Sequence, residues 1–156
     1  MLKGIVCSGF GGQGILTTGI LLAYAGFQNG YKITWYPSYG SEMRGGTANC
    51  IVKLSNEEIA SPYVQAIDIL LTLNEPAIDK FEPKVAPGGW LFVNSSLVNP
   101  GRPYRDDIKV VKVDAEALAD QAGNPKGANI AMLGAVLKTT GLFSLETYET
   151  AMTNYF

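Results

Sequence analysis

The chain alternates short apolar runs with segments of helical length, a pattern typical of an α/β protein. An apolar run at residues 3–8 predicts a buried strand, and residues 13–28 predict a helix that ends near the capping pair Asn29-Gly30. The alternating, β-rich run at residues 31–36 predicts a second strand. Together these segments predict a strand–helix–strand unit with a right-handed crossover.

The same alternation continues to the end of the chain. Further strands are expected from about Thr47, over residues 66–73, over Trp90–Asn94 after a Pro87-Gly88-Gly89 turn, and over residues 108–113. Further helices are expected after the capping residues Asn74 (with Pro76 in the first turn), Asp114 and Ser144, and over residues 128–140, where Ile130, Leu133, Val136 and Leu137 share one face.

These elements add up to one domain over residues 1–156. We expect a three-layer α/β/α fold with a mostly parallel, mixed sheet and a Rossmann-like start. The chain is long enough to bury a sizeable core. It stops at Phe156 without a helix-stop signal, which is consistent with a C-terminal truncation.

The low charge of the chain argues against a nucleic-acid-binding protein. The chain carries a net charge of −2, and only 17% of its residues are charged. No basic face stands out, so binding of nucleic acid through a broad positive surface is not expected. A sparsely charged surface instead suits a protein that is partly covered by a partner.

Residues 4–31 carry no charge, which raises the question of a membrane segment. Glycines and polar residues interrupt the stretch, and its apolar core, Ile20–Ala25, is far shorter than the about 20 residues that a span needs. Lys3 alone makes a weak basic region for a secretory signal. We therefore expect no membrane segment here, but a buried strand, a loop and a buried helix in a cytoplasmic protein.

The two cysteines, Cys7 and Cys50, both lie in apolar strand-like runs. In a cytoplasmic protein this favours buried free thiols over a disulfide. Two thiols without any histidine cannot build a zinc or iron–sulfur site alone. The absence of histidine also removes the usual general base, so catalysis must use other residues or another chain.

The stretch SGFGGQG, residues 8–14, lies between the first strand and the first helix with the spacing Gly9-x-Gly11-x-x-Gly14. In a dinucleotide-binding fold such glycines allow a tight turn beside a phosphate-binding helix N-terminus. That mechanism also needs an acidic residue about 20 positions further on. No Asp or Glu occurs from Cys7 to Ser41, and no Lys follows the loop as a P-loop requires.

Two interpretations of this glycine loop stay open. It is an anion- or backbone-binding turn beneath a helix, or a structural turn in which Gly14 permits close packing of the helix on a strand.

A second stretch, YPSYGSEMRGGTANC at residues 36–50, is more specific. It follows the second strand, at the edge of the sheet where α/β folds place ligands. Arg44 offers a planar fork of donors that suits a carboxylate or a phosphate, and Glu42 is placed to orient it. The alternative is that Arg44 only pairs with Glu42 or with an acid of a partner subunit.

GFGGQG, followed after 22 residues by PSYGSEMRGG, resembles the gamma subunit of 2-oxoacid:ferredoxin oxidoreductases. The same domain occurs fused inside single-chain pyruvate:ferredoxin oxidoreductases and in the indolepyruvate enzyme. The resemblance covers essentially the whole chain and includes NEP at residues 74–76, PGGWLFVNSS, and GANIAMLGAVL in the late helix. Within the family, PSYGSEMRGG is more similar to the 2-oxoglutarate and branched-chain (ketoisovalerate) types than to the pyruvate type.

The resemblance implies a subunit that is inactive alone. The family decarboxylates a 2-oxoacid on thiamine diphosphate, passes electrons through [4Fe–4S] clusters to ferredoxin, and transfers the acyl group to coenzyme A. Thiamine diphosphate, Mg²⁺ and the clusters are expected on alpha, beta and delta-type partner subunits, with no catalytic residue and no metal on this chain. The residues expected to bind substrate or coenzyme A, or to form the interface, are Gly9, Gly11, Gly12, Gln13, Gly14, Ser38, Tyr39, Gly40, Glu42, Arg44, Gly45 and Gly46.

Two other functions compete with this one. The first is a self-sufficient nucleotide-binding dehydrogenase domain, against which the missing ribose-binding acid argues. The second is a scaffold that shares only the fold. The sequence leaves open which 2-oxoacid is used and how many copies of each subunit assemble.

Overall fold

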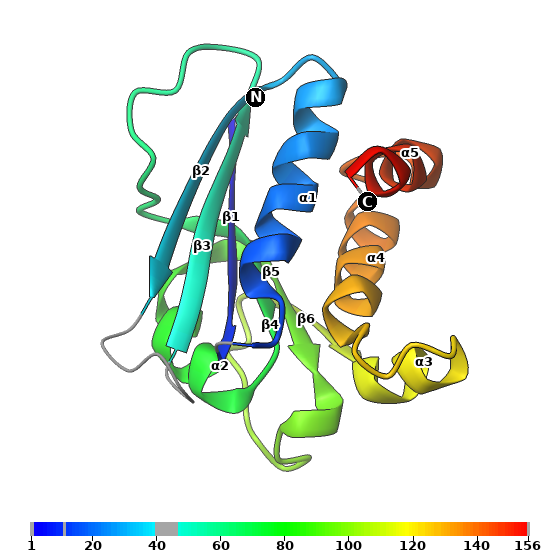
Figure 1. The fold of residues 1–156 in the computed structure, drawn as a ribbon. Helices are drawn as coiled ribbons and strands as arrows, with labels where there is room; N and C mark the ends of the chain where they lie inside the picture. The colour runs from blue at the N-terminus through cyan, green and yellow to red at the C-terminus, as the bar shows by residue number, and fades with distance from the viewer. Residues whose placement is uncertain (1, 11, 40–46, 156) are drawn as a thin grey trace.

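The computed structural model describes residues 2–10, 12–39 and 47–155. In these parts the chain folds around one six-stranded sheet with the order β2-β3-β1-β4-β5-β6 (Figure 1). The strands are β1 (Leu2–Phe10), β2 (Lys32–Tyr39), β3 (Thr47–Ser55), β4 (Ile67–Thr72), β5 (Val85–Asn94) and β6 (Lys109–Val113). The helices are α1 (Ile15–Gln28), α2 (Glu75–Phe81), α3 (Ala115–Gln121), α4 (Ala128–Thr140) and α5 (Leu145–Tyr155), with 3-10 turns at Glu82–Lys84 and Ser95–Leu97.

The predicted mixed, mostly parallel sheet is confirmed. β3 is antiparallel to both of its neighbours, β1 and β2, whereas β1, β4, β5 and β6 pair in parallel. β2 therefore points the same way as β1 but is separated from it by β3, so the predicted strand–helix–strand unit does not join neighbouring strands. All strands except β3 end at one edge of the sheet, which is the edge where α/β proteins bind ligands.

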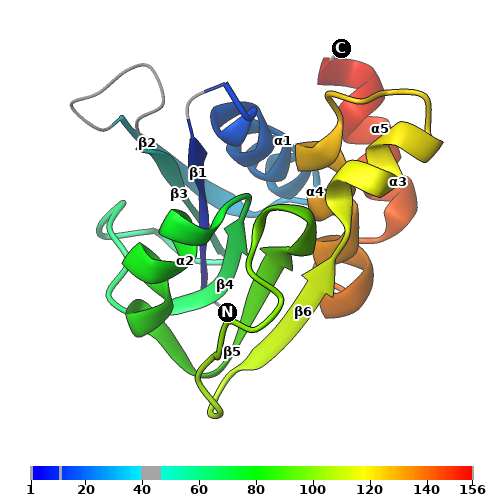
Figure 2. The same ribbon diagram turned by 90° about the horizontal axis from the view of Figure 1, so that it is seen from below.

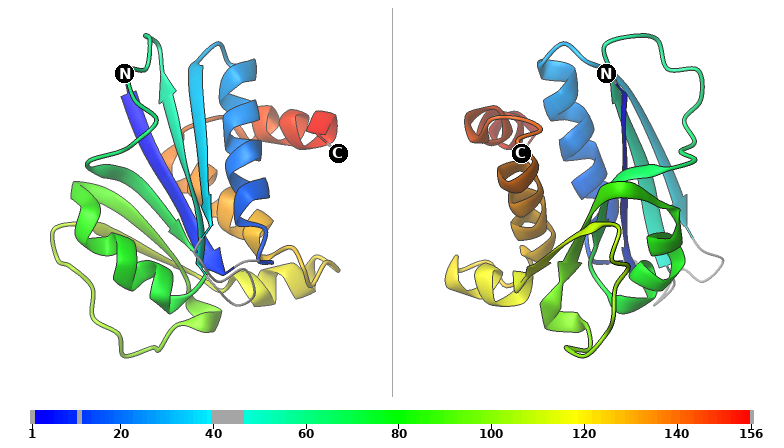
Figure 3. Two further views of the ribbon diagram at one scale, coloured as in Figure 1. Left: turned by 60° about the vertical axis from the view of Figure 1, so that its left-hand side comes forward. Right: turned by 180° about the vertical axis from the view of Figure 1, so that it is seen from behind.

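The helices cover the two faces of the sheet unequally, which completes the predicted three layers. α1 packs on β1, β2 and β3, and α4 lies beside it over β4 and β5. α5 packs on α1, and α3 packs on α4. Among the described residues, one short α-helix, α2, lies on the opposite face, against β1 and β4 (Figures 2 and 3). In the described residues, no helix is long and apolar enough to cross a bilayer.

The uncharged helix α1 packs very closely on the sheet, which explains why residues 4–31 lack charge. Gly19 faces β3 and β2: a Cβ built there would collide with the Cys50 sulfur and would lie 2.9 Å from Trp35 Nε1. Cys50 is paired in register with Cys7, and both are fully buried free thiols, as predicted. The hydrogen bond with Cys50 and burial both raise the pKa of Cys7, which therefore stays a neutral thiol in the core.

Several local predictions are confirmed by hydrogen bonds. Asn74 Oδ1 accepts from Ala77 N–H at 2.9 Å and begins α2, and α4 spans the predicted residues 128–140. The prediction of a turn at Pro87-Gly88-Gly89 is wrong. These residues form a bulge inside β5 rather than a turn before it. Val85 pairs with Ile67 and Trp90 with Ile69, so residues 86–89 together oppose one residue of β4.

Candidate functional site

The glycine loop connects β1 directly to α1 at the ligand-binding edge of the sheet. Gly12 and Gly14 have φ angles of 91° and 77°, which is the left-handed region that favours glycine. The helix predicted from residue 13 therefore begins only at Ile15, because Gly14 cannot adopt a helical conformation with that φ. Nothing lies within 4 Å of a Cβ built on Gly12, so this part of the loop is open.

Gln13 holds the loop to the sheet. Its Oε1 accepts from the Phe10 N–H at 2.7 Å and from Asn74 Nδ2 at 3.1 Å. Gly9 makes room for this arrangement, because a Cβ on Gly9 would lie 2.7 Å from Gln13 Oε1 and 3.1 Å from Leu73 Cβ. The GFGGQG and NEP stretches are therefore in direct contact through two side-chain amides.

Gly14 is a contact point between two helices. Asn129, near the start of α4, donates from Nδ2 to the Gly14 carbonyl at 3.2 Å and to Thr18 Oγ1 at 3.3 Å. A Cβ on Gly14 would lie 2.5 Å from that Nδ2. Gly14 was predicted to permit close packing of the helix on a strand. The structure corrects this prediction, because the atoms nearest to a Cβ on Gly14 belong to α4 and not to a strand.

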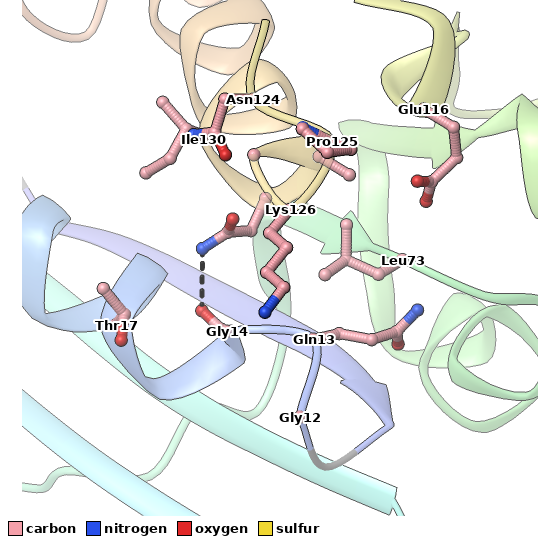
Figure 4. Close-up of a pocket in the computed structure, with 13 residues that line it drawn as sticks. Gly12, Gln13, Gly14, Thr17, Leu73, Glu116, Asn124, Pro125, Lys126 and Ile130 are labelled. Atoms are coloured by element: carbon pink, nitrogen blue, oxygen red, sulfur yellow. Dashed lines mark hydrogen bonds between the residues drawn. The ribbon is translucent and has the colours of Figure 1, made fainter. Parts of the chain in front are cut away.

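A cavity of about 540 Å³ lies between the glycine loop and the segment that leads into α4. Gly12, Gln13 and Gly14 form its floor, and Asn124, Pro125 and Lys126 form its roof (Figure 4). Gly127 and Ala128 also line it. Lys126 extends from the roof toward Gln13 and Gly14, while Glu116 of α3 lies at the other end (Figure 4). The first turns of α1 and α4 both border this space, so their free backbone N–H groups add positive potential to that of Lys126.

Glu116 is tied to the sheet at the far end of the cavity. Asn94, a fully buried residue at the end of β5, donates from Nδ2 to Glu116 Oε1 at 3.3 Å and to the Leu73 carbonyl at 3.4 Å. The cavity therefore has a cationic part beside the glycine loop and an anionic part beside α3. An elongated ligand with an anionic group at one end and hydrogen-bond donors at the other suits this polarity.

The second predicted stretch is anchored next to the glycine loop. Ser38 and Tyr39 end β2, with Tyr39 paired to Ala48, and Thr47 at the start of β3 is paired to Phe10 at the end of β1. The ends of this stretch and the glycine loop thus share one edge of the sheet. The other residues predicted for the site lie outside the described residues: Gly11, Gly40, Glu42, Arg44, Gly45 and Gly46.

Sequence reasoning did not single out four residues of this site: Asn74 as a partner of Gln13, Asn129, Lys126 and Glu116. Asn129 could have been found from the sequence, because a polar amide at a buried position of an otherwise apolar helix needs a hydrogen-bond partner. Lys126 could not have been found in this way, since one lysine in the Gly-Asn-Pro-Lys-Gly turn is ordinary for a loop.

Comparison with a family model decides the family. The model described as pyruvate ferredoxin/flavodoxin oxidoreductase matches residues 4–156. This chain belongs to that family. Among its relatives, the 2-oxoglutarate synthase subunit KorC of Methanocaldococcus jannaschii is 36% identical over 154 residues, covering 97% of this chain and 82% of KorC. The ketoisovalerate oxidoreductase subunit VorA of Methanothermobacter marburgensis is 38% identical over 139 residues, covering 89% of this chain.

Solved structures of the family have the same fold. The gamma subunit of a keto/oxoacid ferredoxin oxidoreductase from Geobacter sulfurreducens matches with a TM-score of 0.81 and 31% identity, covering 99% of this chain and 86% of that chain. The lengths of the relatives differ: this chain spans 28% of VorA, whereas it spans 82% of KorC. The family domain therefore occurs both in long chains and in short ones.

Proposed function

We propose that this chain is the gamma subunit of a 2-oxoacid:ferredoxin oxidoreductase. The family match over residues 4–156, with relatives that are themselves named as subunits of 2-oxoacid oxidoreductases, carries this proposal. The assembled enzyme oxidatively decarboxylates a 2-oxoacid, transfers the acyl group to coenzyme A and reduces ferredoxin. Alpha, beta and delta-type subunits complete it, and this chain is not active alone.

The glycine-loop cavity is the proposed coenzyme A-binding contribution of this chain. Coenzyme A carries phosphates at one end and a pantetheine arm with amide groups beyond them. The phosphates suit Lys126 and the N–H groups at the starts of α1 and α4, and the neighbouring Thr17 can add a hydroxyl donor. Glu116 at the other end can accept from an amide N–H group of the ligand.

The cofactors that drive the chemistry are assigned to the partner subunits. Two observations favour this for the metal ion and the clusters: both cysteines are paired in register inside the core, and the described residues contain no group of three or more Asp, Glu, Cys or His side chains that could hold a metal ion. Thiamine diphosphate, Mg²⁺ and [4Fe–4S] clusters therefore belong to other chains in this proposal.

Reconstitution with the partner subunits tests the proposed function. We expect coenzyme A-dependent oxidation of a 2-oxoacid with ferredoxin reduction, and Lys126→Met should raise KM for coenzyme A about fivefold with little change in kcat, because one charge contact to the ligand is lost. Lys138→Met is the matched control, since Lys138 is an exposed lysine in the last turn of α4, at the opposite end of that helix from the segment that carries Lys126. A complex that needs no coenzyme A would contradict the proposal.

Arg44 is the proposed ligand-binding side chain of the second stretch. Arg44→Lys keeps the charge but loses the planar fork, so an assembled Arg44→Lys enzyme should lose at least about tenfold in kcat/KM for the 2-oxoacid or coenzyme A, roughly 1.4 kcal/mol. Steady-state kinetics of the complex, with assembly followed by gel filtration, measure this. Normal kinetics in an intact complex would reject the ligand role, and failed assembly would assign Arg44 to the interface.

A further inference from the structure

The backbone N–H of Phe10, at the end of β1, donates to a side chain instead of to a neighbouring strand. The Ser8 carbonyl, on the β4 side of β1, accepts from Leu73 N–H at 3.0 Å, immediately after the end of β4. Phe10 lies two residues further along β1, so its N–H points to the same side. β4 ends at Thr72 and the chain turns into α2, so β4 offers no residue to accept this hydrogen bond.

Gln13 takes the place of the missing strand. Its Oε1 accepts from the Phe10 N–H at 2.7 Å, which folds the glycine loop back onto the end of β1. An amide side chain can satisfy this donor only in one of its two orientations, because the opposite orientation would present an NH₂ group to the N–H. The conformation of the loop therefore depends on what fixes the amide of Gln13.

Asn74 fixes that amide. It is 3% exposed, and its own orientation is set because Oδ1 accepts from Ala77 N–H at the start of α2. Its Nδ2 is consequently directed at Gln13 Oε1, at 3.1 Å. Oε1 is held between Phe10 and Asn74, and within the described residues the NH₂ group of Gln13, a residue that lines the cavity, makes no hydrogen bond.

We infer that Asn74 is a positioning residue for the glycine loop: through Gln13 it fixes the loop that forms the floor of the cavity. Asn74 does not line the cavity itself, so it acts on a ligand only through Gln13. The capping of α2 is a separate role of the same side chain, and it uses the other atom of the amide.

Two variants separate the two roles. Serine and aspartate are both good N-caps, but neither has an amide N–H₂ group to donate to Gln13. Asn74→Ser adds no charge, whereas Asn74→Asp adds a negative charge near a site proposed for phosphates. An effect that both variants share is therefore caused by loss of the Nδ2 donor to Gln13. An effect seen in Asn74→Asp alone is caused by the added negative charge.

Hydrogen exchange in the full chain tests the inference without any enzyme activity. We expect the Phe10 amide to exchange at least about tenfold faster in Asn74→Ser and in Asn74→Asp. The midpoint of urea unfolding should stay unchanged in Asn74→Ser because the cap is kept, whereas Asn74→Asp should unfold at a lower urea concentration because it places a buried carboxylate oxygen against Gln13 Oε1. Asn99→Ser is the matched control, since Asn99 makes a similar turn-type hydrogen bond to Gly101 N–H at 2.9 Å outside the site. Wild-type exchange at Phe10 in Asn74→Ser would overturn the inference.

Kinetics of the reconstituted complex give a second test, which rests on the proposed function. Both Asn74 variants should raise KM for coenzyme A about fivefold with kcat within about a factor of two, because the loop contributes binding remote from the reacting atoms. Gln13→Ala should raise KM at least as much, because it also removes a side chain that lines the cavity. The double variant Gln13→Ala/Asn74→Ser should be no worse than Gln13→Ala, because Asn74 acts on the ligand only through Gln13.

The outcomes are distinguishable. Additive effects in the double variant, or a KM change in Asn74→Asp alone, would overturn the positioning role. A wild-type complex without coenzyme A-dependent activity would count against the proposed function, and the exchange experiment would then decide the positioning role by itself.

Discussion

Gly14→Ala is expected to lower the free energy of unfolding of the chain by about 3 kcal/mol. Two costs add at this position. The φ angle of 77° is unfavourable for any residue with a Cβ, and the new Cβ would lie 2.5 Å from Asn129 Nδ2, a side chain that is 7% exposed and held by two hydrogen bonds. Urea unfolding of the full chain, followed by circular dichroism, measures this loss.

Two other glycines separate the two costs. Gly12 and Gly30 also have positive φ angles, of 91° and 82°, but nothing lies within 4 Å of a Cβ on either. Gly12→Ala and Gly30→Ala should therefore each cost only about 1 kcal/mol. Adding Asn129→Ala to Gly14→Ala should recover part of the loss by removing the collision. A Gly14→Ala protein no less stable than Gly30→Ala would show that the contact with α4 is unimportant.

Gly19→Ala is expected to cost about 2 kcal/mol, although alanine is the better helix former. The residue is buried in α1 directly over β3, where its Cβ would collide with the Cys50 sulfur, 0% exposed, and would lie 2.9 Å from Trp35 Nε1. The helix must move away from the sheet or the strand must shift. Thermal and urea unfolding of the chain measure the net effect.

Gly134→Ala is the matched control for Gly19→Ala. Gly134 also lies inside a helix, α4, but nothing lies within 4 Å of a Cβ there, so alanine should stabilise the protein by up to about 1 kcal/mol. The double variant Gly19→Ala/Cys50→Ala should be more stable than Gly19→Ala alone, because the sulfur that the new methyl group strikes is removed. Equal stability of the Gly19→Ala and Gly134→Ala proteins would contradict close packing of α1 on Cys50.

The local elements were predictable because their signals are local. Asn74 and Pro76 mark the start of α2, and the apolar periodicity of residues 128–140 gives α4 at its observed bounds. The order of the strands was not predictable in this way. The apolar pattern of β3 gives the face that it buries, but it does not identify β1 and β2 as the strands that pair with it. The bulge at residues 86–89 was missed for a related reason, since a turn and a bulge use the same Pro and Gly residues.

The site was predictable only in part for the same physical reason. The two glycine-rich stretches are contiguous in sequence, so their composition reveals them. The contacts that shape the loop come from distant positions: Asn74 reaches Gln13 across 61 residues, and Asn129 reaches Gly14 across 115. An asparagine that caps a helix gives no sequence signal for a second partner, because capping alone accounts for its presence.

The position of β3 between β1 and β2 has a consequence for the order of folding. β2 and β3 are joined through residues 40–46 and can form a hairpin locally, whereas β1 must find β3 from a much more distant part of the chain. Local pairings form faster than distant ones, because the entropy lost on closing a loop grows with its length. The hairpin is therefore expected to form before it docks on β1. Since that docking brings Phe10 to Thr47, the glycine loop and the start of β3 are expected to meet only in this late step, so the edge of the sheet proposed for ligand binding should form last in this half of the domain.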